Sequence, residues 1–214
     1  MADFQRHLAV LIVSIAVGGC ASTARDQAAP IVQPGAPGKA SRVITSDDAA
    51  RSRPGVSAAD VKFMQGMIGH HAQAVEMSDL LKARTKRAEM RKLGERIEVS
   101  QADEIKMMRE WLESHGAEAP GEHAHHAPGA PLMPGMLTPE EMARLTAASG
   151  EVFDRLFLEY MIKHHEGALA MVKDLFATAG AAQDADIYAF AADVNADQRM
   201  EIARMSGMLK ELQK

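Results

Sequence analysis

The sequence contains a single cysteine, Cys20, and few aromatic residues, which make up 4% of its 214 residues. One cysteine cannot form a disulfide within the chain, and few aromatic rings leave few platforms on which nucleic-acid bases could stack. The formal net charge of -5 also provides no positive field for phosphate groups. These absences argue against a disulfide-stabilised fold and against nucleic acid as a partner.

Long apolar runs are also absent, apart from residues 8–17 near the N-terminus. This run is too short to span a bilayer as a helix, and the small residues that follow it are typical of a signal peptide. Residues 17–20, VGGC, resemble the lipobox of bacterial lipoproteins, in which the cysteine is lipid-modified. We therefore predict a lipoprotein-type signal peptide over 1–19 and lipid attachment at Cys20, which places the mature protein in the periplasm on a bacterial membrane. An ordinary signal peptide that leaves a free thiol is the alternative.

The rest of the chain divides by composition into a tether and a helical domain. Residues 20–56 are rich in Pro, Gly, Ala and Ser without apolar periodicity, which predicts a flexible tether. Residues 57–214 form the predicted domain, with helical spacing of apolar residues over four stretches, about 57–82, 88–116, 150–179 and 184–212. The segment 117–138 is rich in Pro, Gly and His and is predicted to be a loop, and TPEE at 138–141 predicts a helix start.

The domain contains an internal repeat. The sequence MIGHHAQAVEM at 67–77 returns as MIKHHEGALAM at 161–171, an offset of 94 residues. A second pattern relates Gln101 and Glu104 to Gln198 and Glu201, an offset of 97. Two copies of a helical hairpin, each too small to bury its apolar face alone, predict an all-α fold, an antiparallel four-helix bundle. The copies differ where 166–167 read Glu-Gly and 72–73 read Ala-Gln, so two equivalent sites cannot be assumed.

Helical geometry places one histidine of each pair on the buried face. At about 100° per residue, His70 and His164 fall on the apolar stripes, whereas His71 and His165 fall on the flanks. Glu104 and Glu201 lie on the apolar faces of the partner helices. A buried carboxylate or imidazole is costly unless it is paired or bound to a metal. The pattern therefore indicates either a His–Glu pair that joins the helices of each hairpin or a metal site at the centre of the bundle, and it leaves open whether the two hairpins share one ion.

The methionines favour the metal site. The chain has 15 of them, and thioethers accompany the imidazoles in both copies, a combination that suits Cu(I) or silver. The loop adds His123, His125 and His126, followed by Met133 and Met136. No Glu-x-x-His occurs on the helices, which disfavours a di-iron centre. The candidate ligands in the repeats are His70, His71, Met67, Met77, Glu104, Met108, His164, His165, Met161, Met171, Glu201 and Met205. Core filling remains an alternative explanation for the methionines.

The doubled M-I-x-H-H-x-x-A-x-x-M followed by Q-x-x-E-I-x-x-M resembles a bacterial ferritin-like family catalogued as a domain of unknown function. Its better-studied members are exported copper-binding proteins linked to copper tolerance. The resemblance covers about 57–214 and implies a periplasmic four-helix bundle that binds copper through His and Met. The loop histidines lie outside the shared pattern.

We therefore predict a lipid-anchored copper-binding protein that sequesters or transfers Cu(I) and is not an enzyme. A ferritin-like metal-dependent oxidase is one alternative, and a structural bundle whose His–Glu pairs bind no metal is another. The predicted partners are the metal ion and the membrane. A metal-transfer protein and a second copy of the chain remain open as further partners.

Overall fold

The computed structural model describes residues 29–35, 37–51, 55–121, 124 and 132–213. The predicted lipid site Cys20 and the loop histidines His123, His125 and His126 lie outside these residues. The chain forms two units that divide at residue 52, and each is described by itself.

The N-terminal unit has regular structure where the sequence predicted only a tether. Strands β1 (Ile31–Gln33) and β2 (Arg42–Ile44) pair antiparallel, with Ile31 opposite Ile44, and helix α1 (Ser46–Arg51) follows. β-branched residues supply both strands, and Gly38 has a positive φ of 83° in the connection between them. A strand of three residues is too short for its alternation to stand out from the Pro- and Gly-rich sequence around it.

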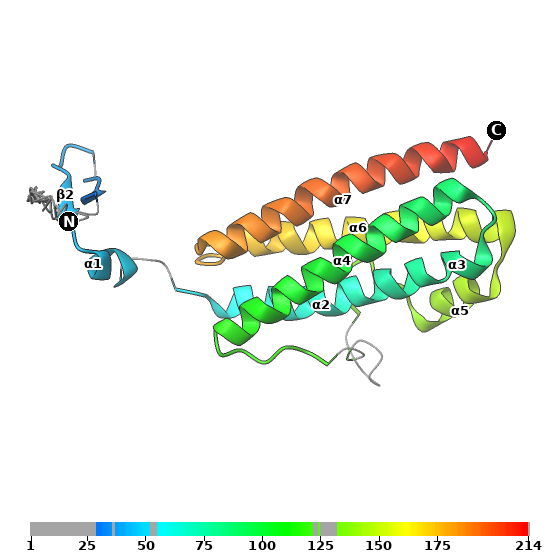
Figure 1. The fold of residues 1–214 in the computed structure, drawn as a ribbon, viewed down its shortest axis with the longest axis horizontal. Helices are drawn as coiled ribbons and strands as arrows, with labels where there is room; N and C mark the ends of the chain where they lie inside the picture. The colour runs from blue at the N-terminus through cyan, green and yellow to red at the C-terminus, as the bar shows by residue number, and fades with distance from the viewer. Residues whose placement is uncertain (1–28, 36, 52–54, 122–123, 125–131, 214) are drawn as a thin grey trace, which may run out of the picture. The chain divides into compact units, whose positions relative to one another are not determined.

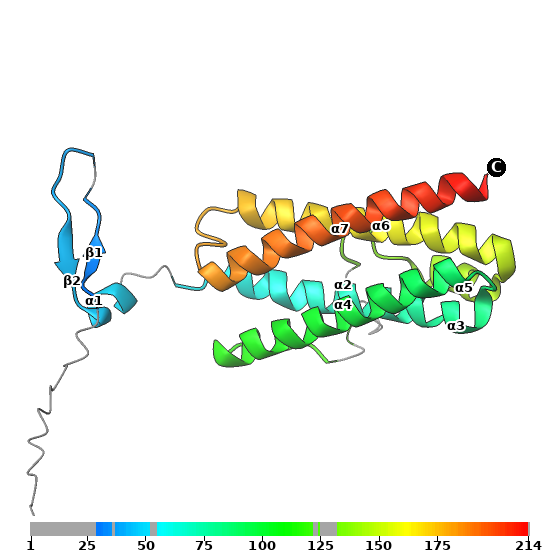
Figure 2. The ribbon, with the colours of Figure 1, turned by 45° about the horizontal axis from the view of Figure 1, so that its top comes forward.

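Four long helices make up the second unit and run side by side (Figures 1 and 2). They are α2 (Ala58–Asp79), α4 (Ala88–Ser114), α6 (Gly150–Ala177) and α7 (Ala185–Leu212), with the short helices α3 (Leu81–Arg84) and α5 (Pro139–Ala147) in the connections. Helix α2 packs along α4 and α6 along α7, while α2 also contacts α6 and joins the two hairpins. The predicted all-α bundle of two hairpins is confirmed.

Side-chain caps begin α2 and α5 at the starts that the sequence predicted. Ser57 and Asp60 form a capping box at the start of α2, and Thr138 and Glu141 form another before α5. The other carboxylate oxygen of Asp60 accepts the backbone N–H of Ala182 at 2.7 Å. The first turn of α2 is thereby bonded to the turn between α6 and α7, so one capping residue also ties the hairpins together.

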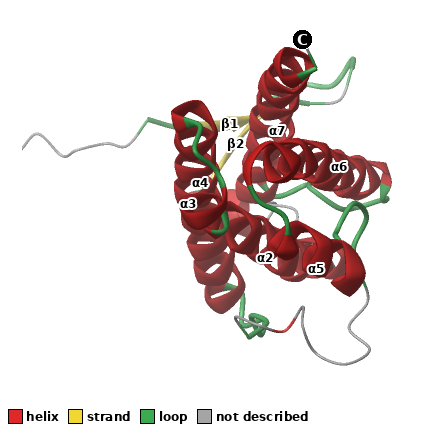
Figure 3. Ribbon diagram, turned by 90° about the vertical axis from the view of Figure 1, so that its right-hand side faces the viewer, coloured by secondary structure: helices red, strands yellow, loops and turns green. Residues whose placement is uncertain are grey.

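The apolar core consists of two clusters separated along α2 and α6 by the histidines. One cluster contains Phe63 to Ile68 of α2 with Ala168 to Leu175 of α6, and the other contains Ala74 to Leu81 with Phe153 to Met161. In the end-on view of Figure 3, α4 and α7 lie on one side of the bundle, and α2, α6 and α5 lie on the other. Within the described residues, no helix is both long and apolar enough to span a bilayer.

Candidate metal centre

The four repeated histidines meet in the middle of the bundle. His70, His71, His164 and His165 are each 0% exposed. The rings of His70 and His164 lie across the contact between α2 and α6, with centroids 3.8 Å apart and planes inclined at 41°. The first histidine of each pair therefore faces its counterpart in the other repeat, in a single central layer.

The second histidine of each pair bonds to a glutamate within its own hairpin. Nε2 of His71 donates to Oε2 of Glu104 at 2.5 Å, and Nε2 of His165 donates to Oε2 of Glu201 at 2.7 Å. These two histidines lie on the flanks of α2 and α6, and both are buried there, because α4 covers the flank of α2 and α7 covers that of α6. Both His–Glu pairs exist, but they leave His70 and His164 to the centre.

The hydrogen bonds assign the free nitrogen of three rings. Nε2 of His70 lies 3.0 Å from the carbonyl oxygen of Pro134, which can only accept, so Nε2 carries the proton and Nδ1 has the lone pair. In His71 and His165 each Nε2 bonds to a carboxylate, so Nδ1 is the ring nitrogen that is not hydrogen-bonded. None of these Nδ1 atoms has a partner, and neither nitrogen of His164 has one.

Two glutamines extend this group of unpaired atoms. Gln101 is 2% exposed, with both amide atoms unpaired, and Gln198 is 3% exposed, with Oε1 unpaired. Of the eleven buried side-chain atoms without a partner in the described residues, eight belong to these glutamines and the four histidines. Gln101 and Gln198 lie about one helical turn before Glu104 and Glu201, which bond to histidines. An unpaired buried polar atom costs about 1–3 kcal/mol, so this set of atoms indicates a site for a ligand that would bond to them.

Burial also keeps the central imidazoles neutral. Burial, and after it the nearby His71, lower the pKa of His70 to about 3. The pKa of His164 is held well below its ordinary value by burial and by the adjacent His70. A neutral imidazole is the form that ligates a metal, so at neutral pH both rings are ready to bind one.

The predicted thioether ligands lie on both sides of the histidine layer. Met67 and Met108 are in one apolar cluster, with Met171 packed against it, and the other cluster contains Met77, Met161 and Met205. No group of three or more His, Cys, Asp or Glu side chains within the described part of the chain is arranged to hold a metal. Imidazole nitrogens together with thioether sulfur would be a donor set that fits a soft ion such as Cu(I).

A short segment that we call the strap, residues 132–137, covers the contact between α2 and α6. Its middle forms a turn in which the N–H of Met136 donates to the carbonyl of Met133, with Pro134 and Gly135 at the central positions. Gly135 has a φ of 79°, as a type II turn requires. Pro134 presents its carbonyl to His70, so the strap closes one side of the histidine layer.

The two repeats differ at the positions that hold the strap. The amide of Gln73 on α2 bonds to both backbone groups of Leu137, whereas Gly167 occupies the equivalent place on α6. A Cβ at Gly167 would lie 1.9 Å from the carbonyl oxygen of Pro134, so only glycine allows the strap to lie there. The sequence showed this difference between the copies but not its purpose, because nothing local indicates that the loop returns across the bundle.

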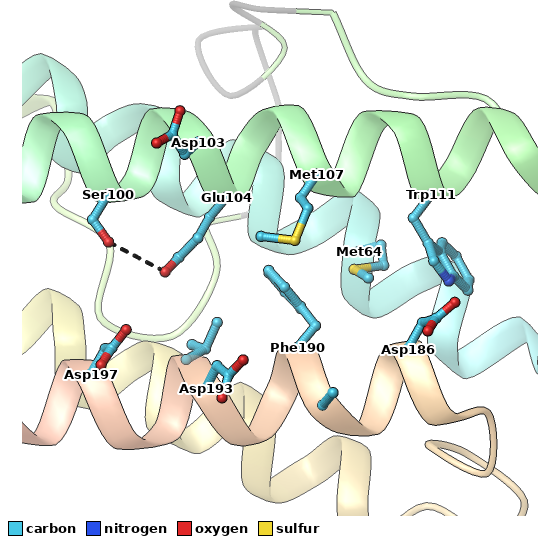
Figure 4. A pocket seen from close by; sticks show the side chains of 12 residues that line it. Met64, Ser100, Asp103, Glu104, Met107, Trp111, Asp186, Phe190, Asp193 and Asp197 are labelled. Atoms are coloured by element: carbon cyan, nitrogen blue, oxygen red, sulfur yellow. Dashed lines mark hydrogen bonds between the residues drawn. The ribbon is translucent and has the colours of Figure 1, made fainter.

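The opposite side of the bundle carries an acidic groove of about 560 Å³ between α4 and α7 (Figure 4). Trp111 and Phe190 contribute apolar surface to it. Its carboxylates are Asp103, Glu104, Asp186, Asp193 and Asp197. Partial burial raises the pKa of Asp197, and so does repulsion from Glu104, Glu201 and Asp193. Since Glu104 lines the groove and also bonds to His71, the groove reaches the edge of the histidine layer.

A protein-family model described as "Domain of unknown function (DUF305)" matches residues 60–209. The chain belongs to this family. The resemblance inferred from the doubled His-His motif is thereby confirmed. No curated protein matches the chain.

Solved structures of DUF305 proteins share the fold. A predicted secreted protein from Streptomyces coelicolor is 30% identical, with 72% of this chain and 93% of that chain covered and a TM-score of 0.62. A DUF305 fragment from Deinococcus radiodurans is 29% identical, with 74% and 99% covered and a TM-score of 0.62. CopM in its Cu(II)-bound form is 25% identical, with 71% and 96% covered and a TM-score of 0.58. CopM has also been solved with Cu(I) and with silver, so a protein of this fold binds these metals.

Proposed function

We propose that this protein binds copper as Cu(I) in the periplasm and holds it for sequestration or transfer, which confers copper tolerance. The observation that carries the proposal is the concentration of unpaired buried nitrogen and oxygen atoms on the four central histidines and two glutamines. The likeness to CopM, whose structures contain copper, supports the choice of metal.

The central pair supplies the nitrogen ligands. Nδ1 of His70 and one nitrogen of His164 face the same interior and are neutral. Met67 and Met161 precede them by three residues, about one helical turn, so their thioethers are the nearest sulfur ligands along each helix. His71 and His165 are held by Glu104 and Glu201 in the manner of carboxylate–histidine pairs that orient metal ligands.

No catalysis is part of the proposal. Glu104 and Glu201, the glutamates nearest the centre, are each occupied by a histidine rather than placed as a bridging pair. Metal uptake and release by ligand exchange then suffice. Oxygen consumption by the Cu(I)-loaded protein should not exceed that of the same Cu(I) held by a chelator, and faster consumption would favour the oxidase alternative.

Export and a lipid anchor complete the proposal. The support is the N-terminal sequence with VGGC at 17–20 and the likeness to a predicted secreted relative. The wild-type chain expressed in a bacterium should fractionate with membranes and carry a lipid adduct by mass spectrometry. Cys20→Ala should remove the adduct and the membrane association.

The decisive experiment is an anaerobic Cu(I) competition titration against a chromogenic chelator, comparing wild type with His164→Leu. We expect the wild type to take Cu(I) from the chelator and His164→Leu to lose at least one equivalent. His115→Ala is the matched control, because His115 is an exposed histidine at the end of α4 and should bind as wild type does.

The metal-free forms of the same variants separate a metal site from a structural role. His164 has no hydrogen-bond partner, so leucine should leave the metal-free bundle as stable as wild type or more stable. Cu(I) should raise the melting temperature of wild type and not that of the variant. A destabilised variant together with a wild type that cannot compete with the chelator would instead support a structural bundle.

A further inference from the structure

Two methionines from distant parts of the sequence converge over Gly66. An ideal Cβ built on Gly66 would lie 3.4 Å from Cε of Met171 and 3.6 Å from Sδ of Met133. These two side-chain ends therefore approach within about 7 Å of each other. Met133 belongs to the strap and Met171 to α6, and both are partly exposed, unlike Met67, Met77 and Met161, which are 0% exposed.

The structure fixes the position of Met133. It is the first residue of the strap turn, and its carbonyl accepts the N–H of Met136 at 3.2 Å. The bonds from His70 to Pro134 and from Gln73 to Leu137 hold the next residues of the strap on α2. Met133 thus lies opposite Met171 because these bonds anchor the strap on α2.

The other repeat has no equivalent of this arrangement. Ninety-four residues after Gly66 the sequence has Tyr160, so the matching position carries a bulky side chain instead of glycine. Met77, the counterpart of Met171, is fully buried. The open position beside Met171 therefore occurs at one end of the contact between α2 and α6, where the strap supplies a second sulfur.

We propose that Met133 and Met171 form a surface site for a soft monovalent metal ion, through which copper enters on its way to the histidine layer. Thioethers are neutral and soft, so a pair of them binds Cu(I) or Ag(I) in preference to Ca²⁺, Mg²⁺ or Zn²⁺. Met171 lies seven residues from His164, about two helical turns along α6. An ion bound at Met171 therefore has a short distance to travel to the imidazole of His164. The entry role rests on the proposed function, whereas the thioether site itself does not.

The test is a titration of the full mature chain, labelled with ¹³C at the methionine methyl groups, with Ag(I) as a redox-inert soft probe. It is performed in the His164→Leu background, where the central site is removed. Resonances are assigned from Met133→Leu and Met171→Leu, which change side-chain volume little. Circular dichroism confirms that each variant is folded.

We expect the methyl resonances of Met133 and Met171 to shift together along one binding curve, and Met133→Leu to weaken Ag(I) binding at Met171 at least tenfold. Met107→Leu is the matched control, since Met107 is 53% exposed on α4 and should leave that curve unchanged. Shifts at Met171 that do not depend on Met133, or that only match those at Met107, would overturn the site.

The wild-type chain distinguishes this inference from the proposed function. If the thioether site and the histidine site both exist, Met133→Leu should slow the transfer of Cu(I) from a chelator to the protein at least tenfold. The equivalent of Cu(I) that depends on His164 should still bind at equilibrium. Paired methionine shifts without any histidine-dependent Cu(I) binding would overturn the entry role and the proposed function but keep the thioether site. Histidine-dependent binding at an unchanged rate would overturn the entry role alone.

Discussion

The side chain of Gln73 bonds to both backbone groups of Leu137, donating to its carbonyl oxygen at 3.0 Å and accepting its N–H at 2.7 Å. Leu137 is 1% exposed, so these backbone groups have no water to replace a lost partner. Gln73 therefore anchors the end of the strap on α2, next to the bond from His70 to Pro134. The second repeat, with Gly167 at the position that matches Gln73, provides the surface on which the strap rests.

Gln73→Ala should destabilise the bundle by about 1–3 kcal/mol, because it leaves a buried N–H and a buried C=O unpaired. Urea unfolding followed by circular dichroism measures this change. Gln65→Ala is the control: Gln65 donates to the carbonyl of Glu118 at 2.7 Å in an exposed setting, so its loss should cost much less. Equal losses for both variants would mean that the strap contributes little to stability.

Gly167→Ala should displace the strap and cost about 1–3 kcal/mol, as expected when a methyl group is forced into filled space. The free energy of unfolding gives the cost, and faster protease cleavage within 117–137 would report the displacement. Gly207→Ala is the matched control in a helix with open space around it, and should raise stability by up to about 1 kcal/mol. A neutral effect of Gly167→Ala would contradict the close packing of Pro134 on α6.

The metal-free protein should lose stability as the pH falls below about 6.5. His70 has a folded-state pKa of about 3 against an ordinary value of 6.5, so the unfolded chain binds a proton first. The contribution of His70 to the free energy of unfolding is complete above pH 6.5. It decreases progressively as the pH falls toward 3, and the loss is roughly 2 kcal/mol at pH 5. His164 acts in the same direction. Urea unfolding between pH 7.5 and 5 measures the slope, which should be shallower for His164→Leu; an identical slope would contradict the prediction.

Asp197→Asn should raise the stability of the bundle slightly at neutral pH. The pKa of Asp197 is raised, first by partial burial and then by neighbouring carboxylates, so its ionised form disfavours the folded state. The gain should not exceed about 0.5 kcal/mol, the usual range for a surface change, and the part due to repulsion should shrink in salt. Thermal unfolding at low and high salt tests this, with Asp174→Asn, exposed on α6, as the control. A loss of stability would mean that the groove carboxylates do not repel one another.

The helices and their faces could be predicted from the sequence because the signals are local. The capping boxes at Ser57 and Thr138 and the repeated spacing of Phe63, Met67 and Met77 each require only neighbouring residues and helical geometry. The duplication also showed that the hairpins have to bury their apolar faces against each other. The prediction failed for residues 31–51, where two strands of three residues carry too little pattern.

The sequence by itself determined which residues are the candidates for metal binding, since a motif kept in both copies selects His70, His164 and their methionines by residue type and periodicity. Only the tertiary structure decided how they combine. The contact between α2 and α6 joins the two central histidines, the partner helices bury His71 and His165 against glutamates, and the strap brings Met133 to Met171. Periodicity specifies the direction of a side chain from its own helix, whereas these relationships depend on which other segment lies in that direction.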